Sequence, residues 1–143
     1  MNSGAAPLTK DLVDAVYKRL KVPVKQGYGL SETSPTTHTQ PWEDWNKTIG
    51  SVGLLLPNQT AKYMSEDGTE VAAGETGELW IAGPNVFLGY LNNEAGTKNA
   101  LTEDGYFKTG DVGKFKLNPL IPVCWSDSVA ENTSVLSFSP SSC

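Results

Sequence analysis

The sequence has few of the residues that build disulfide frameworks and transition-metal sites. Its 143 residues include two cysteines, Cys124 and Cys143, and a single histidine, His38. Two cysteines cannot form a framework of several bridges, and one histidine leaves few donors for zinc. His38 lies in a polar stretch that we expect to be a solvated loop. The composition therefore excludes small disulfide-rich scaffolds and zinc modules.

Long apolar runs and an excess of positive charge are also missing. No apolar segment approaches the roughly 20 residues that a membrane helix needs. Met1 is followed by small and polar residues, unlike the apolar core of a signal peptide. The net charge of -5 argues against non-specific nucleic-acid binding. We expect an intracellular protein, cytoplasmic or peroxisomal and not secreted, with no membrane span and no nucleic-acid partner.

Two short segments contain side chains suited to nucleotide chemistry. Residues 26–33 read Gln-Gly-Tyr-Gly-Leu-Ser-Glu-Thr, and residues 105–111 read Gly-Tyr-Phe-Lys-Thr-Gly-Asp. Gly27 and Gly29 would let the backbone approach a flat ligand, because neither has a Cβ atom. Tyr28 between them could stack on a base, which is worth roughly 1–3 kcal/mol in nucleic-acid complexes. The alternative interpretation is a tight turn between a strand and a loop.

Polar groups in the same segments could bind the rest of a nucleotide. The Ser31 hydroxyl could donate to a phosphate oxygen, and Glu32 is a hard oxygen ligand suited to Mg²⁺. The Asp111 carboxylate could accept hydrogen bonds from both vicinal hydroxyls of a ribose. Residues 4–7, Gly-Ala-Ala-Pro, could form one wall of an adenine slot or simply lead into a helix. Taken singly, the first segment is better explained as a tight turn with a surface glutamate, and Asp111 fits a turn-capping aspartate.

The pattern of apolar residues predicts an α/β layer followed by antiparallel strands. Apolar residues at helical spacing predict a helix over 9–21, followed by an extended segment at 22–26. Residues 35–47 are polar, and we expect a loop there. Short alternating runs bounded by turn residues predict an antiparallel sheet or small barrel. The predicted strands are 51–56, 60–64, 69–72, 78–82, 86–91 and 106–109, and a short helix is predicted at 94–101.

Five blocks in order resemble the signature of a known family. They are residues 3–8, 26–32, 74–81, 83–92 and 109–111. In these blocks the chain resembles the adenylate-forming, AMP-binding superfamily, and it is most similar to acyl-CoA synthetases of the coumarate–CoA ligase type. The resemblance extends from about Ser3 to about Phe115 and ends where the composition changes to proline, serine and cysteine.

The resemblance implies a fold and a division of the chain. The fold class would be an α/β fragment, the end of the large N-terminal domain, followed by a small antiparallel β-barrel-like subdomain. We expect residues 1–48 to end the α/β nucleotide-binding subdomain and residues 49–116 to form the β subdomain with the ribose-binding loop. Residues 117–143 would be a divergent, disordered or irregular tail. The abrupt change suggests an internal fragment of a larger ligase whose tail arose from altered splicing or a shifted reading frame.

The resemblance also implies roles for individual residues. Ser31 would contact the α-phosphate, Glu32 would bind Mg²⁺, and both would be catalytic. Pro35 and Thr36 would lie near the acyl pocket. Trp80, Phe87 and Tyr90 are expected in the core rather than in a site. The residues implied in nucleotide binding are Gly4, Ala5, Ala6, Pro7, Gly27, Tyr28, Gly29, Ser31 and Asp111.

The implied reaction joins a carboxylic acid to CoA in two steps. The acid attacks the α-phosphate of ATP, and a CoA thiolate then displaces AMP from the acyl-adenylate. The family's phosphate loop and its C-terminal adenylation lysine have no counterpart in the sequence, so we expect the chain alone to be inactive. Two alternatives stay open: a non-catalytic nucleotide-binding or regulatory protein, and a non-functional truncated product.

Overall fold

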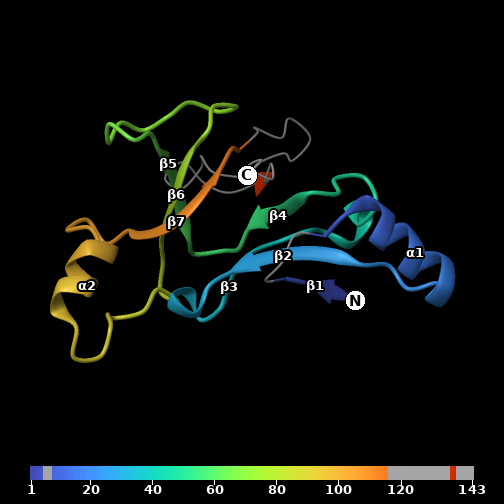
Figure 1. The fold of residues 1–143 in the computed structure, drawn as a ribbon, viewed down its shortest axis with the longest axis horizontal. Coiled ribbons are helices and arrows are strands. Elements are labelled where there is room, and N and C mark those ends of the chain that lie inside the picture. Colours follow the sequence, from blue (N-terminus) through green and yellow to red (C-terminus); the bar gives the residue numbers. More distant parts are fainter. Residues whose placement is uncertain (5–7, 116–135, 138–143) are drawn as a thin grey trace.

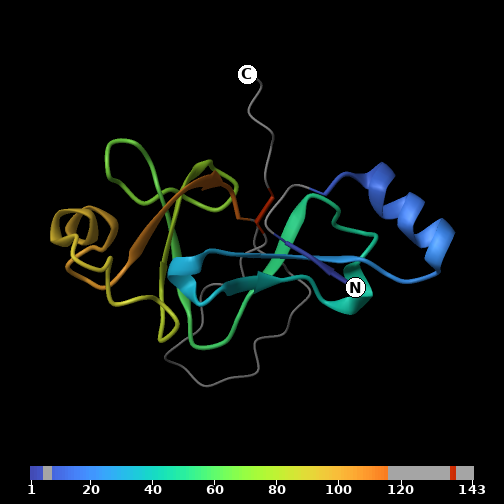
Figure 2. The same ribbon diagram turned by 60° about the horizontal axis from the view of Figure 1, so that its bottom comes forward.

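An α/β part and an antiparallel β part make up residues 1–4, 8–115 and 136–137, which the computed structural model describes (Figure 1). The two α-helices lie at opposite ends of the molecule, and the turned view in Figure 2 agrees. Within the described ranges, neither helix is long and apolar enough to cross a bilayer. The elements in chain order are β1 (Asn2–Ser3), α1 (Lys10–Leu20), β2 (Lys25–Gly29), η1 (Ser31–Thr33), β3 (Thr36–Thr39), η2 (Trp42–Asp44), β4 (Ser51–Leu55), β5 (Thr60–Met64), β6 (Gly77–Ala82), α2 (Glu94–Ala100), β7 (Phe107–Gly113) and β8 (Leu136–Ser137).

Helix α1 forms where the sequence predicts it. The Thr9 hydroxyl caps the first turn by accepting a hydrogen bond from the Leu12 amide at 3.4 Å. The chain leaves the helix at Lys21, which has a φ of 56° and donates its amide proton to the Tyr17 carbonyl. Val13 is buried, whereas Leu12 and Tyr17 remain exposed. Part of the apolar face of the helix is therefore uncovered.

The sheet of the α/β part has the order β1-β2-β3-β4-β8. Strand β1 runs parallel to β2, and the remaining pairs are antiparallel. The predicted loop at 35–47 is wrong in its first part, because residues 36–39 form β3 between β2 and β4. Their sequence Thr-Thr-His-Thr is polar, but threonine is β-branched and fits a pleated surface.

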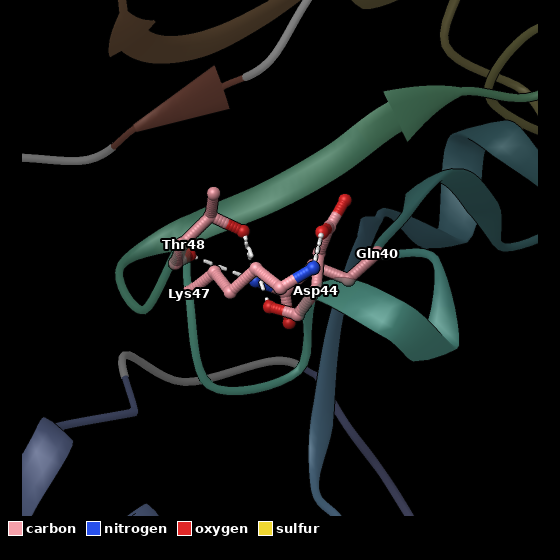
Figure 3. Close-up of polar contacts among 4 residues, drawn as sticks. All are labelled: Gln40, Asp44, Lys47 and Thr48. Atoms are coloured by element: carbon pink, nitrogen blue, oxygen red, sulfur yellow. Dashed lines mark hydrogen bonds and ion pairs between the residues drawn. The ribbon is translucent and has the colours of Figure 1, made fainter.

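The remainder of that loop is fastened to the sheet by a buried amide, Gln40. Its Oε1 accepts a hydrogen bond from the Gln26 amide at 2.7 Å. Its Nε2 donates to the carbonyl and the hydroxyl of Thr48 at 2.8 and 3.0 Å, as Figure 3 shows. An ion pair of 3.1 Å between Lys47 and Asp44 braces the same loop. Gln40 thus ties the loop to β2 through a side chain that has no access to solvent.

The second sheet is antiparallel and has the order β5-β6-β7. Alternate residues of its strands face inward, as the period of two requires. The fully buried side chains include Tyr63, Leu79 and Ile81, and the Phe107 side chain from β7 is only 3% exposed. Strand β5 and most of β6 coincide with the predicted ranges, and β7 extends beyond its predicted end.

Two predicted strands do not form. At 69–72 the chain makes only an isolated bridge between Glu70 and Met64. Residues 86–91 are irregular because their backbone pairs with a different element: the Phe87 amide donates to the Glu32 carbonyl. The α/β and antiparallel fold class is confirmed. The boundaries at residues 48 and 116 stay predictions, and the predicted tail lies outside the described residues except for 136–137.

Candidate functional site

Tyr28 and Asp111, 83 residues apart in the sequence, are in direct contact. The Tyr28 hydroxyl donates a hydrogen bond of 2.5 Å to Oδ2 of Asp111. Tyr28 lies on β2 and Asp111 on β7, so this bond joins the two sheets. The residues predicted to contact a base and a ribose are therefore neighbours. Contacts to a base and to its ribose must lie close together, because the base and the sugar are covalently joined.

The surroundings of Tyr28 keep its hydroxyl a donor. Burial raises the pKa of the Tyr28 hydroxyl far above its ordinary value, and the hydrogen bond to Asp111 raises it further. The residue is nevertheless only half-buried. The ring also lies 5.9 Å from the His38 ring, measured between centroids. The contacts with Asp111 and His38 thus hold the Tyr28 side chain in place.

Asp111 is held by a short framework in β7. Its own amide donates to the Thr109 hydroxyl at 3.1 Å, and that hydroxyl donates to the Leu79 carbonyl at 2.7 Å. Gly110 has a φ of 74°, a conformation that disfavours other residues, and its amide donates to the Glu78 carboxylate. The Thr-Gly-Asp sequence therefore presents the carboxylate from a defined turn of backbone at the edge of the second sheet.

The N-terminal small residues begin next to the Gly-Tyr-Gly segment. Parallel pairing places Ser3 opposite Gln26. A Cβ atom added at Gly4 would lie 3.5 Å from the Gly27 carbonyl oxygen. The structure thus brings Gly4 and Gly27 together, as one nucleotide wall would need. Ala5, Ala6 and Pro7 lie outside the described residues, and their predicted contact with adenine stays a prediction.

Gly29 is required by the chain's own packing. A Cβ atom at this position would lie 1.8 Å from the carbonyl oxygen of Pro35, far inside any allowed contact. The close approach coincides with an irregularity in the pairing of β2 with β3. It brings Pro35 and Thr36, the predicted acyl-pocket residues, beside the end of β2. Their contact with an acyl group stays a prediction.

The 3-10 turn η1 presents the two predicted catalytic residues. Thr33 is fully buried, and its hydroxyl accepts from the Leu30 amide at 3.0 Å and lies 2.6 Å from the Pro35 carbonyl oxygen. These bonds close the turn around Ser31, which is exposed, and Glu32, which is half-buried. Both side chains therefore project from a fixed turn immediately after β2.

Glu32 contacts a residue that was not among the predicted site residues. The Tyr90 hydroxyl donates to Oε1 of Glu32 at 2.9 Å. This bond raises the pKa of the Tyr90 hydroxyl above its ordinary value. The prediction of a core residue is wrong for Tyr90, which is 40% exposed. The Gly-Tyr-Leu-Asn part of the 83–92 block was the signal available in the sequence.

The predicted metal ligand and the predicted ribose ligand lie along one junction. Asp111 meets β2 through Tyr28, and the Phe87–Tyr90 segment meets Glu32 four residues further on. Figure 1 shows the yellow segment before α2 passing beside η1, the turn that follows β2. Strand β7 therefore contacts the Gly-Tyr-Gly segment, and the irregular segment after β6 contacts the η1 turn that follows it.

His38 is part of the sheet and not of a solvated loop. It is fully buried on β3, and burial lowers the pKa of its imidazole to about 3. Its Nδ1 lies 2.9 Å from the Thr37 hydroxyl. The expectation of a solvated histidine is wrong because two flanking strands cover this position. A neutral, enclosed imidazole is a structural group at physiological pH.

Comparison with known families finds a match that covers most of the chain. The chain matches the family described as AMP-binding enzyme over residues 1–91. The chain belongs to the AMP-binding enzyme family. The match includes Tyr28 and Glu32, and it ends one residue after Tyr90.

The proteins that this chain resembles are longer than it is. It is 48% identical over 114 residues to the probable 4-coumarate–CoA ligase 2 of Dictyostelium discoideum, covering 78% of this chain and 20% of that protein. Apo MatB from Rhodopseudomonas palustris has a TM-score of 0.73 at 35% identity, covering 80% of this chain and 23% of that chain. The AMP complex of O-succinylbenzoate coenzyme A synthetase from Bacillus subtilis has a TM-score of 0.71 at 30% identity, with 80% and 23% covered. The chain thus spans about a fifth of the length of the curated relatives it matches.

Glu32 and Ser31 have the side chains needed to bind a nucleotide together with Mg²⁺. Within the described ranges, no three His, Cys, Asp or Glu residues gather into a metal-binding group. Glu32 would therefore offer one carboxylate. Mg²⁺ is commonly bound by one or two protein carboxylates together with substrate phosphates and water. A single half-buried glutamate beside the predicted phosphate-contacting Ser31 fits that donor set.

Proposed function

We propose that the chain forms the AMP-binding wall of an ATP-dependent acyl- or aryl-CoA ligase. The observation that carries the proposal is the hydrogen bond between Tyr28 and Asp111, which pairs the candidate base contact with the candidate ribose contact. Membership of the AMP-binding enzyme family supports it. The printed names of relatives, 4-coumarate–CoA ligases and an acyl-coenzyme A synthetase, support the CoA-ligase class.

Each predicted residue has one task in this proposal. The Tyr28 ring and the backbone at Gly4 and Gly27 would border adenine, and Asp111 would accept hydrogen bonds from the ribose hydroxyls. Ser31 would donate to the α-phosphate. Glu32 would hold Mg²⁺, which supplies positive charge to the phosphates when it is bound. The protein's contribution is orientation, because a carboxylate and an α-phosphate react only when they are aligned.

The proposed reaction forms and breaks two bonds. A substrate carboxylate oxygen attacks the α-phosphorus of ATP, and pyrophosphate leaves. The sulfur of CoA then attacks the acyl carbon, and AMP leaves with the bonding electron pair. The acid substrate would contact Pro35 and Thr36, and its identity stays open. By themselves, the 143 residues would bind nucleotide without ordinary turnover, because they contain no recognisable Ser/Thr/Gly-rich phosphate loop with its lysine.

Calorimetric titration of the 143-residue chain with AMP tests the proposal. We expect Asp111→Asn to weaken AMP binding about tenfold or more, because it removes charge-assisted hydrogen bonds of roughly 1.5–3 kcal/mol. Asp104→Asn is the matched control, since this exposed carboxylate pairs with Lys62 elsewhere on the same subdomain. Equal AMP affinity in both variants, or no AMP binding by the unaltered chain, would refute the nucleotide site.

An ATP–pyrophosphate exchange assay tests the second part of the proposal. With a panel of aromatic, fatty and short-chain acids, the isolated chain should show exchange no faster than a protein-free control. Exchange at an ordinary enzymatic rate would contradict the proposed inactivity of these 143 residues and would leave the nucleotide site in place.

A further inference from the structure

Three hydrogen bonds fasten residues 85–90 to the turn that presents Glu32. The Asn85 side-chain amide donates to the Thr33 carbonyl at 2.6 Å. The Phe87 backbone amide donates to the Glu32 carbonyl at 2.8 Å, and the Tyr90 hydroxyl donates to the Glu32 carboxylate at 2.9 Å. The first two bonds hold the backbone of the turn. Only the third reaches the functional group.

Tyr90 is itself held from two sides. Its ring meets Phe87 edge-on with centroids 4.8 Å apart, and Phe87 packs edge-on against Phe107 of β7 at 5.5 Å. Its backbone amide donates to the Thr97 hydroxyl of α2 at 2.9 Å. The Tyr90 ring is therefore linked to the second sheet through Phe87, and its backbone is linked to α2. A fixed donor restricts a glutamate carboxylate that would otherwise sample several rotamers.

We propose that Tyr90 is a positioning residue for Glu32, holding its carboxylate in one orientation before a magnesium nucleotide binds. The inference rests on the proposed function, because Glu32 is the candidate magnesium ligand there. Partners that orient a metal ligand typically change metal affinity roughly 10–100-fold when they are removed. Tyr90 is 40% exposed, so water can partly replace its hydroxyl, and the lower end of that range applies.

The test is calorimetric titration of the 143-residue chain with ATP, once with excess Mg²⁺ and once with EDTA. Tyr90→Phe keeps the ring and removes the hydroxyl. We expect it to weaken magnesium-dependent ATP binding about tenfold and to leave binding in EDTA unchanged. Tyr106→Phe is the matched control, because its ring contacts Lys62 at 4.0 Å on the same subdomain. Binding by this control should equal that of the unaltered chain in both solutions.

A double variant separates positioning from general loosening of the structure. Glu32→Gln should weaken magnesium-dependent binding more than Tyr90→Phe does. The combined variant should bind no more weakly than Glu32→Gln alone, since Tyr90 acts through Glu32. Independent, additive losses would overturn the inference, as would an equal loss in EDTA, which indicates a merely structural role. Failure of the unaltered chain to bind ATP in either solution would overturn the proposed function and with it the role of Tyr90. Unchanged magnesium dependence in Tyr90→Phe would overturn the Tyr90 inference alone.

Discussion

The two parts of the molecule differ in how many polar side chains they bury. Among the described residues, the α/β part buries three valines and also six polar side chains, the latter all between residues 26 and 51. In the β5-β6-β7 sheet the buried side chains are apolar. The polar set is Gln26, Thr33, Thr37, His38, Gln40 and Ser51, and the apolar set is Ala61, Tyr63, Leu79, Ile81 and Phe107.

This difference assigns different physical tasks to the two parts. Apolar burial is non-directional, and it stabilises the second sheet, which contains Asp111 and packs against Phe87, the neighbour of Tyr90. Hydrogen bonds are directional, so the Gln40 bond to the Gln26 backbone and the Thr37 bond to the Tyr28 carbonyl hold the Gly-Tyr-Gly segment in one conformation. The Thr33 hydroxyl holds η1 in the same way. The candidate nucleotide site lies where the rigid polar framework meets the apolar scaffold.

Shortening a side chain in the apolar scaffold should have the largest effect on stability. Leu79→Ala removes a fully buried side chain and leaves a cavity, which typically costs about 2–5 kcal/mol. Leu91→Ala is the control, because Leu91 is 92% exposed. Urea unfolding of both variants measures the difference. Similar unfolding free energies for the two variants would contradict the assignment of the second sheet as the scaffold.

Removing one polar group from the α/β part should have a somewhat smaller effect. Gln40→Met preserves much of the side-chain volume but leaves the buried Gln26 amide without its acceptor, at a cost of about 1–3 kcal/mol. Gln59→Met is the control, since its bond to the Thr36 carbonyl is 3.5 Å long. If Gln40→Met unfolds at the same urea concentration as its control, the Gln40 hydrogen bonds do not stabilise the α/β part.

Acid should destabilise the α/β part through His38, and this is the smallest of the three effects. The folded imidazole has a pKa of about 3 and an ordinary value of 6.5, so only the unfolded chain takes up the proton between these values. The free energy of unfolding is therefore highest above pH 6.5 and falls as the pH decreases towards 3, by roughly 1–2 kcal/mol between pH 6.5 and pH 5.

Urea unfolding of the unaltered chain and of His38→Gln at these two pH values isolates the histidine contribution. The variant should lack most of the pH dependence, because glutamine does not titrate. If the unfolding free energy changes equally with pH in the two proteins, His38 takes up protons in the folded state as well.

Local signals in the sequence predicted the elements whose causes are local. Helix α1 follows from its apolar spacing and from Thr9 at its start, and β5 follows from alternation between turn signals. Strand β3 was missed because its polar residues are buried by pairing on both sides, which no local pattern reveals. The predicted strand at 86–91 was wrong because the Phe87 amide bonds to η1 instead of to a neighbouring strand.

The candidate site could be predicted only in part. The chemistry of Tyr28, Glu32 and Asp111 follows from their side chains, but their proximity depended on the resemblance to a family, since 83 residues separate Tyr28 from Asp111. Tyr90 was missed because an aromatic residue beside apolar ones usually belongs to a core. Its role depends on which way the hydroxyl points, and the fold determines that direction.

Nuclear magnetic resonance titration of the isotope-labelled chain with AMP tests the central claim most directly. Saturable shifts should appear together at the backbone amides of Tyr28 and Asp111 and at the neighbouring Gly29 and Gly110, while α1 remains unchanged. Shifts confined to only one of the two sheets, or the absence of any saturable shift at Tyr28 and Asp111, would contradict a shared nucleotide site.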